Sequence, residues 1–286
     1  MDKTGLFIGI STLDCIYLTE KMPKENQKIV ALDQTISGGG PATNAAVTFS
    51  YLGNKSNLLT IIGNNPIGSL IKSDLANYSL KLIDITPERK ETPAVSAIVV
   101  TKATGNRAVI SINTTKFKAT IEQIPQNILQ GIDIILIDGH QMTISQEIAR
   151  LAREQNIPVA IDGGSWKKDF DKVLPYVDYA VCSADFYPPN CSDREQVFNY
   201  LKKFDIPNIA ITNGDKAIEY LSRGERGKIA IESIENVVDT LGAGDIFHGA
   251  FCHYILQHNF KQALTEAAKI ASKSCQFFGT RKWMEK

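Results

Sequence analysis

The stretch Asp239-Thr240-Leu241-Gly242-Ala243-Gly244-Asp245 runs directly into the small-residue segment Ile246-Phe247-His248-Gly249-Ala250-Phe251. A Gly-Ala-Gly turn at the start of a helix points several backbone N–H groups at one place, where the helix dipole adds positive potential. Such a place suits the negative charge of a phosphoryl group in transfer. Asp245 stands at the same helix start and could accept a proton from a hydroxyl, although capping the helix is the commoner role for Asp there. The glycines in front of it favour a phosphate-handling turn.

A second glycine block precedes another predicted helix, in the segment Ser37-Gly38-Gly39-Gly40-Pro41-Ala42-Thr43-Asn44. Its glycines let the backbone approach a ligand closely, and Pro41 suits the first turn of a helix. Apolar residues then recur at helical spacing as far as Leu52. Asn44 would lie on the first turn, able to donate and accept hydrogen bonds toward hydroxyls. A tight turn with Asn44 as a cap is equally compatible with this block.

Strands and helices alternate along most of the chain. Short apolar strands are predicted at Leu6–Ile10, Asn57–Ile62, Ile132–Ile137, Pro158–Ile161, Tyr179–Cys182 and Asn208–Thr212. Helices are predicted at Ala42–Leu52, Ile67–Tyr78, Ser145–Gln155, Arg194–Phe204, Ile246–His258 and Gln262–Phe278. Several of the strands have no polar alternation, as expected where helices cover both faces of a parallel sheet. The sequence therefore predicts an α/β fold with a doubly wound, mostly parallel sheet flanked by helices.

Two stretches break this alternation and predict a small, discontinuous β-sheet. Lys28–Ile36 reads as one strand, and Ala94–Val100 and Arg107–Ile112 read as a hairpin. We expect a single domain over residues 1–286, with a β-lid built from roughly 12–36 and 92–113. An exposed edge of that sheet would favour a homodimer formed through the lid.

The composition excludes several classes of function. Among 286 residues, 31 Lys and Arg balance 31 Asp and Glu, which gives no electrostatic footprint for nucleic acid or an anionic membrane. A small-molecule partner is therefore expected. The apolar runs are of strand length, no signal peptide is evident, and the five cysteines form no C-x-x-C pair. These features predict reduced thiols and a cytoplasmic protein.

Taken together, the two glycine blocks resemble the two signatures of the PfkB (ribokinase-like) carbohydrate kinase family, over roughly Leu6 to Gly279. Within the family, the segment from Ile8 to Asp14 and on through Asn44 is most similar to ketohexokinases and sulfofructose kinase. The resemblance implies a ribokinase-like fold and ATP-dependent phosphorylation of a hydroxyl on a small neutral sugar, with a ketose favoured. It implies ATP and Mg²⁺ as cofactors, with K⁺ as a further candidate.

The resemblance also implies roles for residues at the acceptor site. Asp245 would be the catalytic base, and the N–H groups of Gly242, Ala243 and Gly244 would form the anion hole. Asp14, expected at the end of the first strand, would hold the sugar hydroxyls. The other residues implied to bind the sugar are Gly39, Gly40 and Asn44.

A further set of residues is implied to serve the nucleotide and cations. Thr212 and Gly214 match the family's T-x-G turn against the nucleotide, together with Gly242 and Gly244. Arg107 stands where a lid arginine approaches the phosphates. Asp239 matches the region that binds a monovalent cation in some members. Asp185 would take part in an indirect Mg²⁺ contact.

Three departures from the family pattern bear on the substrate and the metal. The family's N-x-x-E motif falls at Cys182-Ser183-Ala184-Asp185, so an Asn is lost and Asp185 is one methylene shorter than Glu. Pro41 stands where ketohexokinase has an Asn, which weakens the case for fructose itself. Members that act on sugar phosphates carry a Lys in the glycine block, whereas Gly39-Gly40-Pro41-Ala42 is neutral.

Two alternatives remain open at this stage. A nucleoside kinase shares the fold and both motifs, and the altered segment Cys182–Asp185 would also fit a non-catalytic sugar or nucleotide sensor. The chain has neither a P-loop nor a G-x-G-x-x-G after a strand. His248, His253 and His258 are too far apart around a helix to share a metal. His140 is expected to be a loop residue rather than a sugar contact.

Overall fold

The computed structural model describes residues 2–112 and 117–285 of the chain. Residue 113, the end of the second predicted lid range, and residues 1 and 286, the ends of the predicted domain, lie outside the described residues. The strands are β1 (Thr4–Ile8), β2 (Thr12–Thr19), β3 (Asp33–Gly39), β4 (Lys55–Thr60), β5 (Leu80–Asp84), β6 (Ala94–Thr101), β7 (Arg107–Ile110), β8 (Ile134–Ile137), β9 (Val159–Gly163), β10 (Tyr179–Ser183), β11 (Asn208–Asn213), β12 (Lys216–Ser222) and β13 (Glu225–Ile229). The α-helices are α1 (Pro41–Tyr51), α2 (Pro66–Leu75), α3 (Met142–Glu154), α4 (Phe170–Val173), α5 (Arg194–Lys202), α6 (Ala243–Ile255) and α7 (Phe260–Ser274).

The larger sheet has a doubly wound topology. Within the described residues it has nine strands in the order β13-β12-β11-β10-β9-β8-β1-β4-β5. β1 pairs in parallel with both β4 and β8, and the chain builds the sheet outward from β1 in both directions. β12 and β13 complete one edge in antiparallel pairing. The predicted fold class is confirmed, and the switch point beside β1 and β8 is where ligands bind in such sheets.

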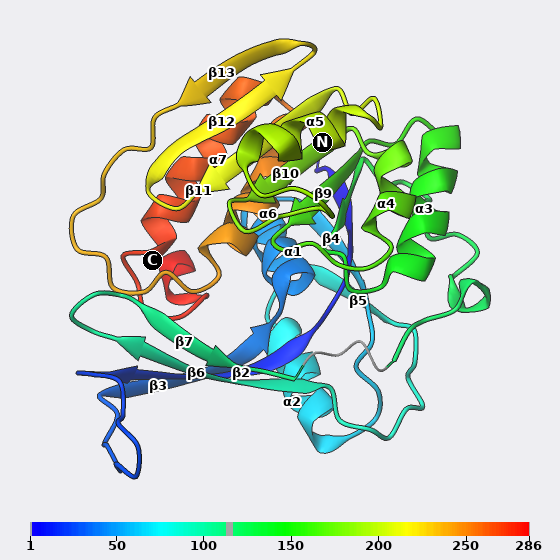
Figure 1. Ribbon diagram of the computed structural model, residues 1–286. Helices are drawn as coiled ribbons and strands as arrows, with labels where there is room; N and C mark the ends of the chain where they lie inside the picture. Colours follow the sequence, from blue (N-terminus) through cyan, green and yellow to red (C-terminus); the bar gives the residue numbers. More distant parts are fainter. Residues whose placement is uncertain (1, 113–116, 286) are drawn as a thin grey trace.

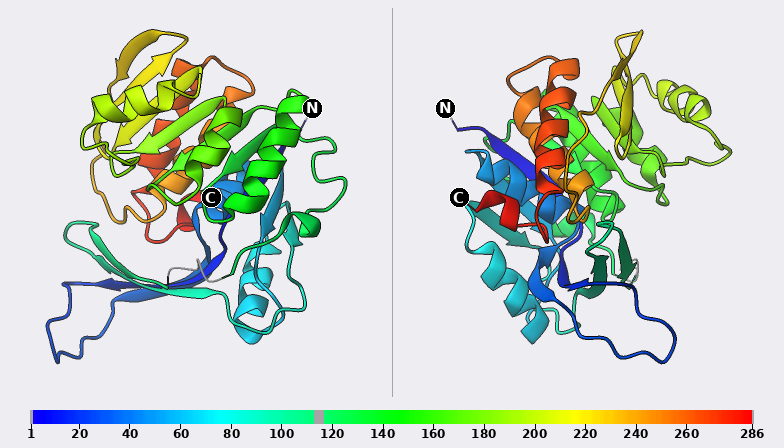
Figure 2. Two further views of the ribbon diagram at one scale, coloured as in Figure 1. Left: turned by 45° about the vertical axis from the view of Figure 1, so that its right-hand side comes forward. Right: turned by 90° about the vertical axis from the view of Figure 1, so that its left-hand side faces the viewer.

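The central strands contribute side chains to two apolar cores, one on each face of the sheet. Leu6 and Ile8 of β1 pack with residues of α3, α4 and α5, whereas Phe7 packs with residues of α1, α6 and α7. Successive side chains of a strand point to opposite faces, so a strand without polar residues needs cover on both sides. The ribbon views show this three-layer arrangement, with the small sheet set against one end of it (Figures 1 and 2).

The predicted separate small sheet is confirmed, but its strands differ from the prediction. Its order is β3-β2-β6-β7 within the described residues. Asp14 lies inside β2 of this sheet and not at the end of the first strand, because the first strand already ends at Ile8. The predicted strand Lys28–Ile36 starts too early. β3 begins at Asp33 and continues through the glycines expected in a loop, which pair with Thr12 and Leu13 of β2.

Several element boundaries escaped the sequence analysis. Strands β5, β12 and β13, which lie at or next to the edges of the large sheet, were not predicted, because they carry mixed polar and apolar residues that give a weak pattern. α6 begins three residues earlier than predicted, at Ala243, and ends at Ile255, so His258 lies beyond it. α7 ends at Ser274, before the predicted Phe278.

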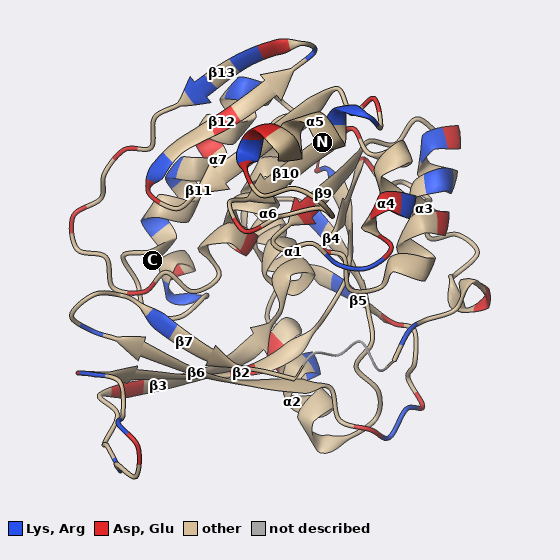
Figure 3. Ribbon diagram, viewed as in Figure 1, with Lys and Arg blue, Asp and Glu red and all other residues tan. Residues whose placement is uncertain are grey.

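The structure also bears on the expected surroundings of the protein. In the described part of the chain, no helix is both long and apolar enough to cross a lipid bilayer. All five cysteine thiols are free, as expected. Acidic and basic residues are interspersed over both sheets and their helices (Figure 3).

Candidate active site

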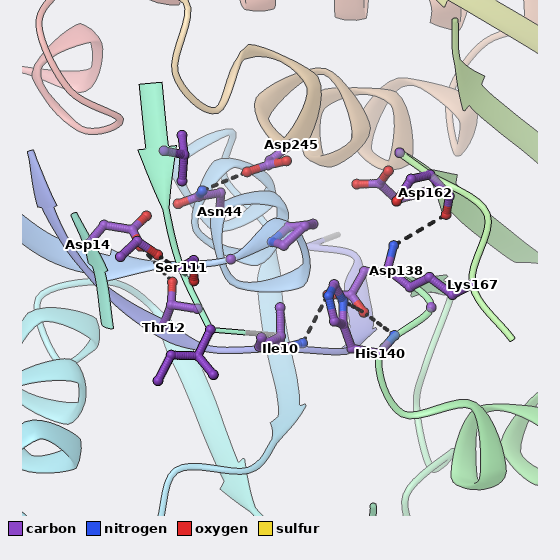
Figure 4. Close-up of a pocket in the computed structure, with 18 of the residues that line it drawn as sticks. Ile10, Thr12, Asp14, Asn44, Ser111, Asp138, His140, Asp162, Lys167 and Asp245 are labelled. Carbon is purple, nitrogen blue, oxygen red and sulfur yellow. Dashed lines mark hydrogen bonds and ion pairs between the residues drawn. The ribbon is translucent and has the colours of Figure 1, made fainter. Parts of the chain in front are cut away.

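A cavity of about 730 Å³ opens at the carboxyl ends of β1, β8 and β9, between the large sheet and the small one. The N-terminus of α6 contributes Asp245 to its wall, and β2 contributes Asp14 (Figure 4). Four of the residues predicted to bind substrate or catalyse transfer meet here, namely Asp14, Gly40, Asn44 and Asp245. The position matches the switch point of the sheet.

Asp245 does not cap its helix. The N-cap of α6 is Gly242 in a left-handed conformation with φ 70°, and no side-chain cap hydrogen bond is present there. Asp245 is the third residue of the helix, where its carboxylate accepts a hydrogen bond of 2.7 Å from Nδ2 of Asn44. The capping role weighed from the sequence is therefore wrong, because the glycine in front of the helix takes the cap position.

The environment of Asp245 raises the pKa of its carboxyl group to about 7. Burial is the largest cause, followed by repulsion from the carboxylate of Asp162. The hydrogen bond from Asn44 and the proximity of His248 oppose the rise without cancelling it. A carboxylate with this proton affinity is matched to accepting a proton near neutral pH.

Asn44 meets Asp245 because α1 and α6 approach closely. A Cβ atom on Gly249 of α6 would collide with the backbone carbonyl of Ala45 in α1. The absence of a side chain at Gly249 therefore lets the two helices touch one turn away from Asp245. This packing carries Asn44, the neighbour of Ala45, to the carboxylate.

Arg281 fixes the orientation of the Asn44 amide, and the sequence analysis missed it. Its guanidinium donates 2.8 Å to Oδ1 of Asn44 and 2.5 Å to the carbonyl of Gly38. Because Oδ1 accepts from Arg281, the Nδ2 group is the one that faces Asp245. Arg281 belongs to the segment after α7, close to the small sheet in Figure 1, and no motif marks it in the sequence.

Asp14 lies on the opposite side of the cavity and is held by polar neighbours. Thr12 donates a hydrogen bond of 2.7 Å to its carboxylate. Burial raises its pKa, while the hydrogen bonds from Thr12 and Ser96 and the charge of Arg281 oppose that rise. A Cβ atom on Gly39 would overlap the Asp14 carboxylate, so the lack of a side chain at Gly39 leaves room for this acidic group.

Asp138 and His140 extend the site beyond the residues predicted from sequence. The Asp138 side chain is fully buried and accepts hydrogen bonds from the backbone N–H groups of Ile10, Ala42 and His140, at 2.9, 3.3 and 2.9 Å. Nδ1 of His140 lies 3.0 Å from the same carboxylate. His140 therefore stands on the cavity wall, although the sequence favoured a plain loop residue. Its place after a buried strand was the available signal.

The glycine turn borders the cavity, and the small sheet reaches it. Gly244 is exposed, and a Cβ atom there would meet nothing within 4 Å. Among the described residues, the Ala243 amide makes a long contact of 3.4 Å, to the carbonyl of Thr240.

Two side chains hold the loop in front of this turn. Arg107, at the start of β7, donates 2.7 Å to the Thr240 hydroxyl and 3.1 Å to its carbonyl. The Asp239 carboxylate accepts from the amides of Leu241 and Gly279, at 2.8 and 2.9 Å, and so clamps the loop.

The remaining predicted residues lie along the neighbouring strand ends. The Thr212 hydroxyl donates 3.3 Å to the carbonyl of Cys182, where β10 and β11 run side by side. Gly214 follows with φ 59°, and Asp185 is exposed just after β10. Within the described residues, none of these three lines the acceptor cavity. Nor does any group of three or more His, Cys, Asp or Glu form a metal cage there.

Comparison with known proteins places this site in a family. The model of the pfkB family of carbohydrate kinases matches residues 3–286. The chain belongs to this family. It is similar to ribokinase of Dictyostelium discoideum, with 25% identity covering 98% of this chain and 97% of the relative. It is also similar to ketohexokinase of Mus musculus, with 20% identity covering 97% of this chain and 98% of that protein.

The solved structures agree on the fold of this carbohydrate kinase. The structure of Arabidopsis thaliana ribokinase complexed with ribose and ATP matches with a TM-score of 0.78 and 20% identity, and it covers 100% of both chains. At this identity the likeness shows the ribokinase fold. The family resemblance drawn from the two glycine blocks is thus confirmed.

Proposed function

We propose that this pfkB kinase transfers the γ-phosphoryl group of ATP to a hydroxyl of a small sugar bound in the cavity. The observation that carries the proposal is Asp245, whose proton affinity is raised at the N-terminus of α6, facing a cavity with Asp14 on its other side. A base near neutral pKa beside a glycine turn is what proton removal coupled to phosphoryl transfer requires.

The other residues divide between the acceptor and the phosphates. Asp14, Gly40 and Asn44 would orient the sugar, with Gly39 backing Asp14. The amides of Gly242, Ala243 and Gly244 would stabilise the phosphoryl charge at the helix N-terminus. Arg107 supports this assignment because its side chain already reaches Thr240 beside the turn. Movement of the small sheet as a lid would exclude water from the transferring group.

The nucleotide and cation assignments rest on the strand ends beside the cavity. Thr212 and Gly214 would contact the nucleotide. Mg²⁺ is commonly held by one or two carboxylates together with substrate phosphates, and the single exposed carboxylate of Asp185 fits that arrangement. Bound Mg²⁺ would supply charge neutralisation on the phosphates. A K⁺ ion is proposed near Asp239, whose carboxylate accepts from the amides of Leu241 and Gly279.

The class of acceptor is proposed from the lining of the cavity. The neutral glycine block favours an uncharged sugar of the ketose type. A second candidate, a sugar acid or phosphorylated sugar, is favoured by three lysines on the cavity wall, Lys118, Lys167 and Lys168. Within the described residues, none of these three lysines forms an ion pair with a carboxylate. The nearby ion pair of Lys172 with Asp169 lies outside the residues that line the cavity.

The first experiment is ADP release from Mg²⁺-ATP with a panel of ketoses, aldoses, sugar acids, sugar phosphates and nucleosides, with Asp245→Ala as the control. A sugar that releases ADP with the wild type and not with the variant supports the proposal and names the acceptor. Turnover of nucleosides alone would replace it with a nucleoside kinase. ATP binding without turnover of any compound would favour a sensor.

The outward face of the small sheet supports a homodimer formed through the lid. Tyr17, Ile36, Val95 and Ile110 share this face by strand register, with exposed fractions of 38, 53, 37 and 76%. Pairing two copies would remove this apolar surface from water. Sedimentation tests the proposal, because Ile36→Lys should convert a dimer of the wild type into a monomer. A monomeric wild type at high concentration would refute it.

A further inference from the structure

His248 of α6 lies between two backbone carbonyls and a carboxylate, one helical turn after Asp245. Its Nδ1 atom is 2.7 Å from the carbonyl oxygen of Gly244, and its Nε2 atom is 3.0 Å from the carbonyl oxygen of Val181 in β10. The same Nδ1 atom lies 3.3 Å from Oδ2 of Asp162 at the end of β9. Both side chains are buried, with exposed fractions of 5% and 6%.

These partners limit the hydrogen-bonding role of each ring nitrogen. Carbonyl oxygens only accept hydrogen bonds, and a neutral imidazole has a single N–H group. Either neutral tautomer would therefore leave one ring nitrogen lone pair against a carbonyl oxygen at hydrogen-bond distance. A doubly protonated ring donates to both carbonyls and places its positive charge beside the carboxylate of Asp162.

The pair stands next to the proposed base. Asp162 and Asp245 both line the cavity, as the close-up shows (Figure 4). The groups that act on Asp245 come from four elements: Asn44 from α1, Asp162 from β9, His248 from its own helix and Asp14 from β2. Asp162 and Asp14 favour the protonated form of Asp245, whereas His248 and Asn44 favour the ionised form.

We propose that His248 donates from both ring nitrogens as an imidazolium paired with Asp162, and that this buried pair is a positioning pair that balances the charge around Asp245. The backbone carbonyls of Gly244 and Val181 hold the cation in place, and the cation offsets a carboxylate that would otherwise keep Asp245 protonated. The proposed effect on Asp245 rests on its proposed function as the base. The protonation of His248 does not.

The protonation is tested directly on the wild-type protein by ¹⁵N NMR of its imidazole rings. The chain has four histidines. We expect the His248 ring to remain doubly protonated at pH 8.5, with a signal that disappears in His248→Gln. His140→Gln is the matched control, because His140 also faces a carboxylate, and it should leave that signal in place. A His248 ring that is neutral at pH 8.5 would overturn the proposal.

The effect on the base is tested by the pH dependence of kcat/KM in two opposite variants. His248→Gln should move the acidic limb upward by about one pH unit, because Asp162 loses its counter-charge. Asp162→Asn should move the limb downward, and the double variant should return toward the wild type. A purely structural role would lower kcat/KM without opposite displacements of the limb.

The outcomes separate this inference from the proposed function. If the wild type turns over no acceptor, the proposed function fails while the NMR measurement still decides the state of His248. If the ring is an imidazolium but the acidic limbs of the wild type, His248→Gln and Asp162→Asn coincide, the effect of the pair on Asp245 is refuted. The kinase activity then stands. Thermal melting identifies any variant that does not fold, and in that case the wild-type NMR result carries the test.

Discussion

Two carboxylates at the same edge of the sheet, the buried Asp138 and the half-buried Asp245, have pKa values shifted in opposite directions. Burial alone would raise the pKa of both groups. The side chain of His140 is the largest cause that opposes burial at Asp138. The backbone N–H of Ile10 and the charge of Lys167 also oppose it, so the pKa of Asp138 lies below its usual value. Asp245 receives one amide hydrogen bond and stands beside Asp162, so its pKa is raised.

The difference lies in the hydrogen-bond donors and the neighbouring charges around each carboxylate. A carboxylate surrounded by donors is held ionised, and its charge ties together the segments that donate to it. Asp138 thus joins the loops after β1 and β8 with the start of α1. A carboxylate with few donors has a raised pKa, which a general base that works near neutral pH requires. Asp138 is therefore an anchor, whereas Asp245 has the proton affinity that its proposed role as the base requires.

The largest expected effect is the loss of turnover in Asp245→Asn. Removing the proton acceptor should lower kcat by ~10² or more, whereas ATP should still bind. Stability should rise at alkaline pH, because the variant no longer holds a poorly compensated carboxylate in the site. Single-turnover kinetics and thermal melting measure the two effects. Unchanged turnover would remove Asp245 from the role of base.

Asp138→Asn should reverse this pattern and mainly reduce stability. An amide cannot accept all the donors that the carboxylate satisfies, and we expect a loss of about 3 kcal/mol in the free energy of unfolding. Denaturant titration measures it at pH 7. The wild-type contribution should be present above the unfolded pKa of about 4 and should disappear as the pH falls through the lowered folded pKa. An unchanged midpoint would contradict the anchor.

The pH dependence of activity should follow Asp245 and not Asp138. Because the pKa of Asp245 is raised to about 7, kcat/KM should rise with pH up to that value and fall about tenfold per unit below it. The same shift gives a contribution to stability that is fully present below the unfolded pKa of about 4 and is lost progressively as the pH rises through the folded pKa. A pH–rate profile from pH 5 to 9 measures the limb, and a flat profile would contradict the assignment.

The smallest effect is expected from Gly39→Ala. The added methyl group would overlap the Asp14 carboxylate and displace it, which should raise KM for the acceptor by roughly tenfold with little change in KM for ATP. Gly38→Ala is the matched control in the same strand, because its Cβ would meet Asp74 and Ile71 instead. Equal effects of the two substitutions would mean that general strain in β3 is responsible.

The sequence by itself determined the family, the doubly wound sheet and the two glycine blocks. These features are local, because apolar strands, helical spacing and a glycine turn before a helix each depend on neighbours along the chain. The same locality explains how Asp245, Asn44 and Asp14 could be singled out. It also explains the errors at β2 and β3, where an acidic residue and glycines pair in a sheet that local patterns do not reveal.

Only the tertiary structure decided which groups surround those residues. Arg281 reaches Asn44 across 237 positions of the chain, and His248 meets Asp162 only when the end of β9 and α6 converge. The charge of a buried group depends on donors and neighbours within a few ångströms, and folding brings these together from distant segments. Sequence therefore names the carboxylate that we propose as the base, and packing sets its proton affinity.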